Sequence, residues 1–150
     1  MKIVKIVLVA LVGICVGCTS AKFWIASYSI HEIIEKKNAI DSADNPAMSF
    51  VLLDQLDRKK VVIEKGIVKQ VMPSANIDYK FCVIVTVEHS SGVVECYVYT
   101  KNWLNEEDLT SVAELKPGDV VYVVGRFSRF LKLLGQQYAV ELLEANLSKK

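Results

Sequence analysis

The sequence predicts a mainly β protein, with a small five-stranded barrel that follows short N-terminal helices and a signal or anchor segment. Three observations support this fold class. Sixteen valines fall between residues 61 and 147, and β-branched residues favour strands. The apolar runs in that region are separated by turn residues. Two of the runs also carry a glycine in their interior, where glycine marks a bend or bulge. The 150 residues suffice for one domain with an appendage.

The first eighteen residues read as an export signal. Lys2 and Lys5 precede an apolar run over residues 6–14, which is too short for a transmembrane helix of about 20 residues. The run ends in Gly17 and Cys18 and so resembles the lipobox of bacterial lipoproteins, in which the cysteine becomes the lipidated first residue. Cys15 departs from the leucine that is usual in that pattern.

The lipobox resemblance implies that palmitate and related acyl chains on Cys18 anchor the protein to a membrane of the cell envelope. Thr19 follows the cysteine, in place of the aspartate that favours retention at the inner membrane. In a Gram-negative host this implies the periplasmic face of the outer membrane. An uncleaved N-terminal anchor and plain secretion are the alternatives. The expected divisions are a signal peptide at 1–17, a tether and short helix at 18–44 and the barrel domain at 45–147.

Two short helices are expected before the barrel. Ser29 and Glu32 have the spacing of a capping box, which predicts a helix over 30–38 after a tether that runs from Thr19 to Tyr28. His31 would be a solvated residue of that helix. A second helix is expected over 47–56, with one apolar stripe at spacing three. The stripe consists of Phe50, Leu53 and Leu56.

Five strands are expected after these helices, and a short helix capped by Asn105 separates the third strand from the fourth. Gly66 and Gly125 lie inside long strands, where a small barrel needs bends. Five strands with a helix in this position have the order of an OB-fold barrel. The expected strand ranges are 61–71, 81–88, 93–100, 120–127 and 137–144.

Residues 45–147 resemble the tRNA_anti-like family of bacterial OB-fold proteins, many of which are lipoproteins. The resemblance lies in the Lys60–Val68 strand, in Cys96–Val98 and in the Leu115–Phe127 turn and strand. The family name refers to the anticodon-binding OB-fold of tRNA synthetases. The resemblance brings no catalytic residues. The sequence has no Gly-rich phosphate loop and no GxSxG or HExxH motif, and two histidines with four cysteines argue against a His-built metal site. We therefore expect no enzyme, no cofactor and no metal site.

The second and third strands form a hairpin, and their register follows from the turn. Centring the turn between Ser90 and Ser91 pairs residues whose numbers add up to 181. Cys82 then lies opposite Tyr99, and Cys96 opposite Val85. Because side chains alternate between the two faces of a strand, the two cysteines point to opposite faces. We therefore expect two buried, unpaired thiols.

The outer face of this hairpin is one candidate ligand surface. Tyr97 and Tyr99 share the face that OB-folds use for binding, where aromatic rings could stack on a base or a sugar. In the alternative interpretation the two rings cover Ile84 and pack against the N-terminal helices.

The segment 126–135, expected to be the loop between the fourth and fifth strands, is the other candidate. Arg126, Arg129 and Lys132 alternate there with Phe130 and other apolar residues. Such a basic aromatic loop suits an anionic polymer, a headgroup or a protein. In the alternative interpretation its apolar residues close the end of the barrel.

Charge bears on the class of ligand. Residues 61–147 contain 8 basic and 11 acidic side chains, whereas nucleic-acid binders use many cations to neutralise phosphates. The sequence therefore favours a lipid-anchored, non-catalytic binding module for a protein or a small ligand. The alternative is a single-stranded nucleic-acid or tRNA-like binding protein.

Overall fold

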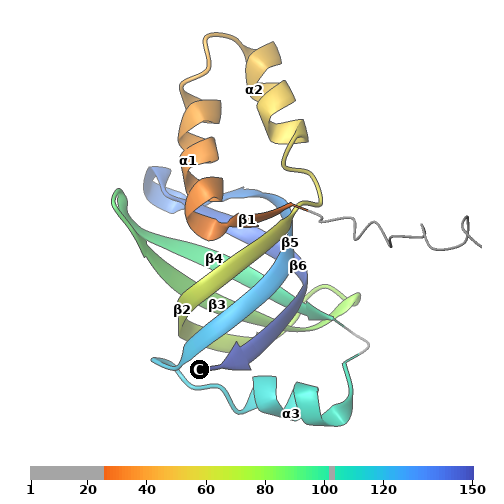
Figure 1. Cartoon of the computed structure of the whole chain (residues 1–150). Coiled ribbons are helices and arrows are strands. Elements are labelled where there is room, and N and C mark those ends of the chain that lie inside the picture. The colour runs from red at the N-terminus through yellow and green to blue at the C-terminus, as the bar shows by residue number, and fades with distance from the viewer. Residues whose placement is uncertain (1–25, 102–103) are drawn as a thin grey trace, which may run out of the picture.

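The computed structural model describes residues 26–101 and 104–150 (Figure 1). Most of the expected helices and strands are present, several with longer bounds. The elements are β1 (Ser27–Ser29), α1 (Ile30–Asp41), α2 (Pro46–Asp54), β2 (Lys60–Pro73), β3 (Tyr79–His89), β4 (Gly92–Lys101), α3 (Glu106–Ala113), β5 (Val120–Lys132), the 3-10 turn η1 (Leu134–Gln136) and β6 (Tyr138–Lys149).

Five long strands close into a barrel, as the sequence predicts. They pair in the order β2-β3-β4-β6-β5, and β5 pairs back onto β2. The β4–β6 pairing is parallel, while the other four barrel pairings are antiparallel. This order, with α3 between β4 and β5, is that of an OB-fold. The short β1 adds one further strand, which pairs in parallel with the start of β2.

The two strand glycines lie at the expected bends. The β2–β5 register shifts between Ile63 and Gly66, and the β5–β6 register shifts across Gly125, between Val124 and Arg126. At Gly66 the space is also closed, because a Cβ atom would lie 2.2 Å from the Val85 Cγ1 atom. Glycine therefore serves both curvature and close packing at this point of β2.

The predicted hairpin register is confirmed: Cys82 pairs with Tyr99 and Val85 with Cys96. Both cysteines are buried and neither forms a disulfide. Cys96 lies in the barrel core, where burial raises the pKa of its thiol to about 12. The thiol is therefore neutral at physiological pH and behaves as a small apolar core residue.

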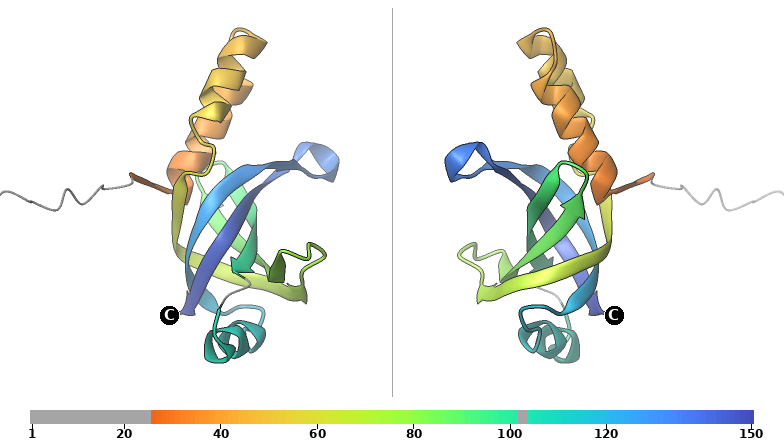
Figure 2. Two further views of the ribbon diagram at one scale, coloured as in Figure 1. Left: turned by 90° about the vertical axis from the view of Figure 1, so that its right-hand side faces the viewer. Right: turned by 90° about the vertical axis from the view of Figure 1, so that its left-hand side faces the viewer.

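Helices cover both ends of the barrel (Figures 1 and 2). At one end, Ile30, Ile33 and Ile34 of α1 are buried in the core cluster, and at the other end Val112 of α3 and Leu115 enter the same cluster. The predicted caps are present. Ser29 and Glu32 form the capping box of α1, and the Asn105 side chain accepts a hydrogen bond from the first turn of α3.

Three expectations were wrong in detail. Ser27 and Tyr28, expected within the tether, form β1 together with Ser29 on the edge of β2. The segment 126–135 is not a loop, because β5 continues to Lys132 and pairs with β6 over that length. The stripe expected on the second helix does not pack: Leu56 is buried just beyond α2, but Phe50 is 69% exposed. Periodicity indicates the helix, while its packing depends on the barrel surface.

Cys18 and the signal segment 1–17 lie outside the described residues, so the lipidation and the signal peptide stay predictions. Within residues 26–101 and 104–150, none of the helices is both long and apolar enough to cross a membrane.

We predict that Gly66→Ala destabilises the barrel by about 1–3 kcal/mol, because the new methyl group overlaps Val85. The measurement is urea unfolding of the wild type, of each single variant and of the Gly66→Ala/Val85→Ala double variant. The double variant should lose less stability than the sum of the two single changes, since a smaller residue at 85 leaves room for the methyl group. Gln70→Ala, an exposed position on the same strand, is the control. Strict additivity would contradict this packing explanation.

Candidate functional site

A continuous groove follows the outer side of β5. It consists of three hollows of about 310, 390 and 370 Å³. The first two share Asp57, Phe127 and Ser128, and the second shares Arg126 and other lining residues with the third. We call this continuous surface the β5 groove.

The groove is lined by segments that lie far apart in the sequence. Phe50 and Leu53 come from α2, while Asp57 and Arg58 come from the connection to β2. The connection is held beside β5 because the Phe127 amide donates a 2.8 Å hydrogen bond to the Lys59 carbonyl. Strand β6 contributes Leu143, Glu144 and Asn146. The groove therefore exists only in the closed barrel.

Charge is unevenly distributed along the groove. The hollow farthest from α2 is lined by the cationic side chains of Arg58, Lys60, Lys101 and Arg126, with Glu144 as the acidic residue. The hollow beside α2 instead combines apolar side chains with acidic ones. Its apolar members are Phe50, Leu53, Phe127 and Phe130, and its acidic members are Asp54 and Asp57. One end of the groove therefore suits an anionic group, and the other end suits an apolar one.

Two residues in the cationic hollow have unusual backbones. Arg58 has φ 54° and Glu144 has φ 51°, the left-handed region that non-glycine residues rarely adopt. The Arg126 Nε atom lies 3.2 Å from a Glu144 carboxylate oxygen. Because such backbones cost of the order of 1 kcal/mol and concentrate at functional sites, their occurrence together supports this hollow as part of the site.

A buried carboxylate lies beside the groove and contacts two of its lining residues. Glu141 is only 7% exposed, and its register partner on β5 is Arg129. The Arg129 Nε atom lies 3.0 Å from one oxygen of Glu141, and Ser128 donates a 2.8 Å hydrogen bond to the same oxygen. Ion pairing and hydrogen bonding together offset the loss of hydration of the buried charge.

Phe130 forms the apolar end of the groove and belongs to an aromatic cluster. Its ring centroid lies 4.9 Å from that of Phe127 and 5.8 Å from that of Tyr138. The Lys37 ammonium of α1 lies 5.6 Å from the Phe130 centroid and also pairs with Asp41. Phe130 therefore joins α1 to the barrel as well as lining the groove.

The two predicted tyrosines lie on a neighbouring surface. The register places Tyr97 beside Ile84 on β3 and beside Glu141 on β6. Tyr99 contacts Tyr79, with ring centroids 5.6 Å apart. We call the three tyrosines with Glu141 the tyrosine face. Burial raises the pKa of Tyr99 to about 12, so its hydroxyl is neutral and available for hydrogen bonding.

The structure thus brings together some of the predicted residues. Arg126, Arg129 and Phe130 line the β5 groove, and Glu141 connects them to Tyr97 across β6. Lys132 is exposed at the last position of β5 and is not among the groove's lining residues. The ligand-binding role of all these residues stays a prediction.

Sequence reasoning missed the contribution of Arg58 and Glu144. Their charge is visible in the sequence, but their backbone conformations and their proximity are not. It also missed a contact between the chain's two histidines. His31 of α1 stacks on His89 at the end of β3, with ring centroids 5.6 Å apart. Only the position of α1 on the barrel brings these rings together.

Comparisons with known proteins show the fold alone. No family model matches the chain, and no curated protein matches it. Among solved structures, the OB domain of MM0293 from Methanosarcina mazei is 9% identical with a TM-score of 0.37, over 63% of this chain and 74% of that chain. The single-stranded DNA binding protein Rim1 of S. cerevisiae mitochondria is 16% identical with a TM-score of 0.35, over 63% and 97%.

A third similar structure is described as an aspartyl-tRNA synthetase from Leishmania major Friedlin. It is 8% identical with a TM-score of 0.40, over 88% of this chain and 22% of that chain. At these TM-scores none of the three likenesses carries an argument about ligands. The resemblance to the tRNA_anti-like family likewise stays a prediction beyond the shared barrel type.

We predict that Arg129→Ala lowers the free energy of unfolding by about 1–3 kcal/mol, because the buried Glu141 carboxylate loses its charged partner. The second change in Arg129→Ala/Glu141→Gln should recover part of this loss by removing the charge. Arg126→Ala is the matched control. Its partner Glu144 is more exposed, so it should cost at most about 1 kcal/mol. Equal losses in urea unfolding for the two arginine variants would contradict this difference.

Proposed function

We propose that this chain is a lipid-anchored protein of the cell envelope, related to the tRNA_anti-like lipoproteins. Its OB barrel binds an extended segment of a partner protein, or a small ligand, without catalysis. The observation that carries the binding proposal is the β5 groove, in which three hollows of about 310, 390 and 370 Å³ adjoin one another. Shape and varied chemistry of this kind are typical of ligand sites.

The charge pattern supports a ligand with two different ends. An acidic group, such as a carboxylate, would lie near Arg126 and Lys60, where cations outnumber acids. An apolar group would lie near Phe130, at the end of the groove beside α2. An extended peptide with an acidic residue and an apolar residue has both features, as does an amphiphilic small molecule.

The proposed anchor is Cys18. Its support is the sequence alone: a positive start, a short apolar run and a small residue before the cysteine. Acyl chains bury about 0.8 kcal/mol per methylene, and two or more chains hold a protein stably. In a Gram-negative host the barrel would then face the periplasm from the outer membrane.

Single-stranded nucleic acid is the second candidate. The tyrosine face favours it, because aromatic rings on this side of an OB barrel can stack bases. The ion pairs on the same side weigh against it, since Lys69 pairs with Glu95 and Arg129 with Glu141. A labelled twenty-nucleotide oligo-dT strand should give no anisotropy change at low salt. Binding that weakens with salt and is lost in Tyr97→Ala would replace our proposal.

We predict that a photo-crosslinking amino acid at position 128, inside the β5 groove, captures the ligand in the host cell. Intact mass measurement of the adduct then separates a protein from a small molecule. The yield should fall at least fivefold in Arg126→Ala, because that change removes a cation from the groove. The same crosslinker at Glu107, an exposed position on α3 at the other end of the barrel, is the control. The same adducts from both positions, or none at 128, would contradict the binding proposal.

We predict that radiolabelled palmitate enters the wild-type chain and not Cys18→Ala. The thiol of Cys18 is the proposed acceptor, whereas Cys82 and Cys96 are buried. Cys96→Ala, whose label should equal that of the wild type, is the control. Equal labelling of the wild type and Cys18→Ala would refute the anchor.

A further inference from the structure

Helix α2 exposes apolar side chains to solvent, where polar side chains are usual. Its sequence is PAMSFVLLD, and none of its nine residues is buried. Four large apolar side chains are between 40% and 69% exposed: Met48, Phe50, Val51 and Leu53. A helix that is apolar on all sides is normally enclosed by other groups, and contiguous exposed apolar surface of this kind marks an interaction site.

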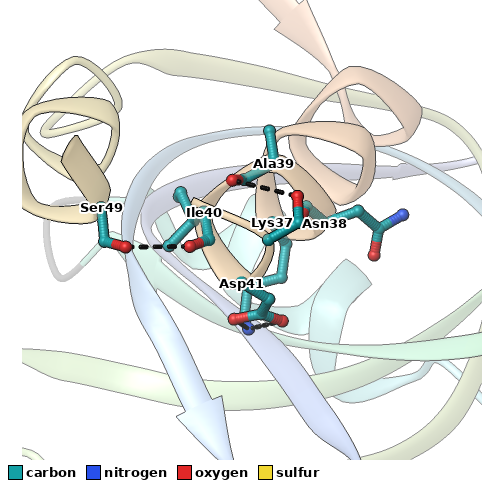
Figure 3. A network of polar contacts seen from close by, with 7 residues as sticks. Lys37, Asn38, Ala39, Ile40, Asp41 and Ser49 are labelled. Carbon is teal, nitrogen blue, oxygen red and sulfur yellow. Dashed lines mark hydrogen bonds and ion pairs between the residues drawn. The ribbon is translucent and has the colours of Figure 1, made fainter. Parts of the chain in front are cut away.

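Helix α2 is exposed although it forms a well-ordered helical hairpin with α1. Asn45 caps α2, and Pro46 stands at its first position. The Ser49 hydroxyl donates a 3.0 Å hydrogen bond to the Ile40 carbonyl, which ties α2 to α1 (Figure 3). Helix α1 is held on the barrel by Ile30, Ile33 and Ile34. The hairpin therefore projects α2 away from the barrel as an ordered unit (Figure 2).

The length of the N-terminal segment indicates what can cover α2. Eight residues lie between Cys18 and Ser27, and the nine Cα–Cα steps that join these two residues span at most about 30 Å when extended. An acyl anchor at Cys18 would hold the start of α1 within that distance of the bilayer. The 12 residues of α1 measure about 18 Å. The hairpin is thus long enough to bring α2 onto the membrane that holds the anchor.

The sequence that precedes β1 and α1 has a composition that suits a membrane interface. Phe23, Trp24 and Ile25 lie between the proposed lipid and Ser27, and tryptophan is enriched at membrane interfaces. A second copy of the chain is a poorer occupant. A stable dimer buries about 800 Å² on each partner, whereas a nine-residue helix of about 14 Å length and 10 Å width offers roughly 400 Å² of lateral surface.

We infer that α2 docks at the interface of the membrane that carries the Cys18 anchor, with Met48, Phe50, Val51 and Leu53 among the acyl chains. This inference rests on the proposed lipid anchor. Helices that lie at a membrane interface bury their apolar side chains near the headgroup boundary. Asp44 and Asp54 flank the apolar residues, so α2 favours zwitterionic over anionic lipid. Docking would also bring the Phe50 end of the β5 groove to the membrane surface.

The test uses the full chain, purified from host membranes and reconstituted in phosphatidylcholine vesicles. An environment-sensitive fluorophore is attached to Val51→Cys on α2, or to Ile77→Cys in the β2–β3 loop as the matched control. Ile77 is apolar and 94% exposed, and the β2–β3 loop that carries it lies away from the helical hairpin (Figure 1). The protein without an added cysteine gives the background, because Cys82 and Cys96 are buried. Nitroxides on the lipid acyl chains quench whatever enters the bilayer.

We expect at least twofold stronger quenching at position 51 than at 77. Phe50→Ser/Leu53→Ser should abolish this difference without changing the melting temperature, because both side chains are exposed in the folded chain. Equal, weak quenching at both positions in vesicles that carry the protein would overturn the inference and leave the anchor intact. A second outcome would also overturn the inference: the chain forms a dimer in solution, Phe50→Ser/Leu53→Ser dissociates that dimer, and position 51 is not quenched. In that case the occupant of α2 is a second copy of the chain.

Failure of the anchor has its own readout, the acyl mass on Cys18. If that mass is absent, the chain is labelled at 51 or 77 in a Cys15→Ser/Cys18→Ser background, so that no other accessible thiol carries the fluorophore, and is mixed with preformed vesicles. Quenching at 51 but not at 77 would then sustain docking of α2 without the anchor, and its absence would overturn both proposals.

Discussion

Closure of the barrel is the constraint on which the other features depend. Strand β2 pairs with β3 along one part of its length and with β5 along another, so it has to bend between the two. Gly66 lies at that bend, against Val85 of β3. With β2 bent, the inward residues of all five strands meet in one core. The same closure sets β5 beside the α2–β2 connection and thereby creates the β5 groove.

The two N-terminal helices differ in burial: α1 packs into the core, whereas α2 stays exposed. Helix α1 places its isoleucines in the core and its lysines at the aromatic rings around it. Helix α2 has an even more apolar sequence, yet it buries none of its residues. The core cluster of the described residues contains no side chain of α2. The exposed apolar side chains of α2 are the reason that we propose a membrane contact there.

Charges on the outer side of the barrel form ion pairs between strands. Arg129 and Glu141 are register partners on β5 and β6, and Lys69 on β2 reaches across β3 to Glu95 on β4. This arrangement leaves the tyrosine face with little net charge. The cationic hollow around Arg126 is different, because Arg58 and Lys60 add charge there from a segment remote in sequence. An acidic ligand would distinguish between these two surfaces.

Local patterns in the chain were enough to locate the five barrel strands, the bending glycines, the caps at Ser29 and Asn105 and the register that separates Cys82 from Cys96, but not β1 or the full length of β5. Each of these depends on residues close together in the chain or on strict alternation along a hairpin. The gathering of Arg58, Arg126 and Glu144, the stacking of His31 on His89 and the exposure of α2 depended on the folded chain. These features arise where distant segments meet. The hydrophobic periodicity of the sequence does not predict these contacts, because they depend on how the closed barrel and the helices at its ends pack together.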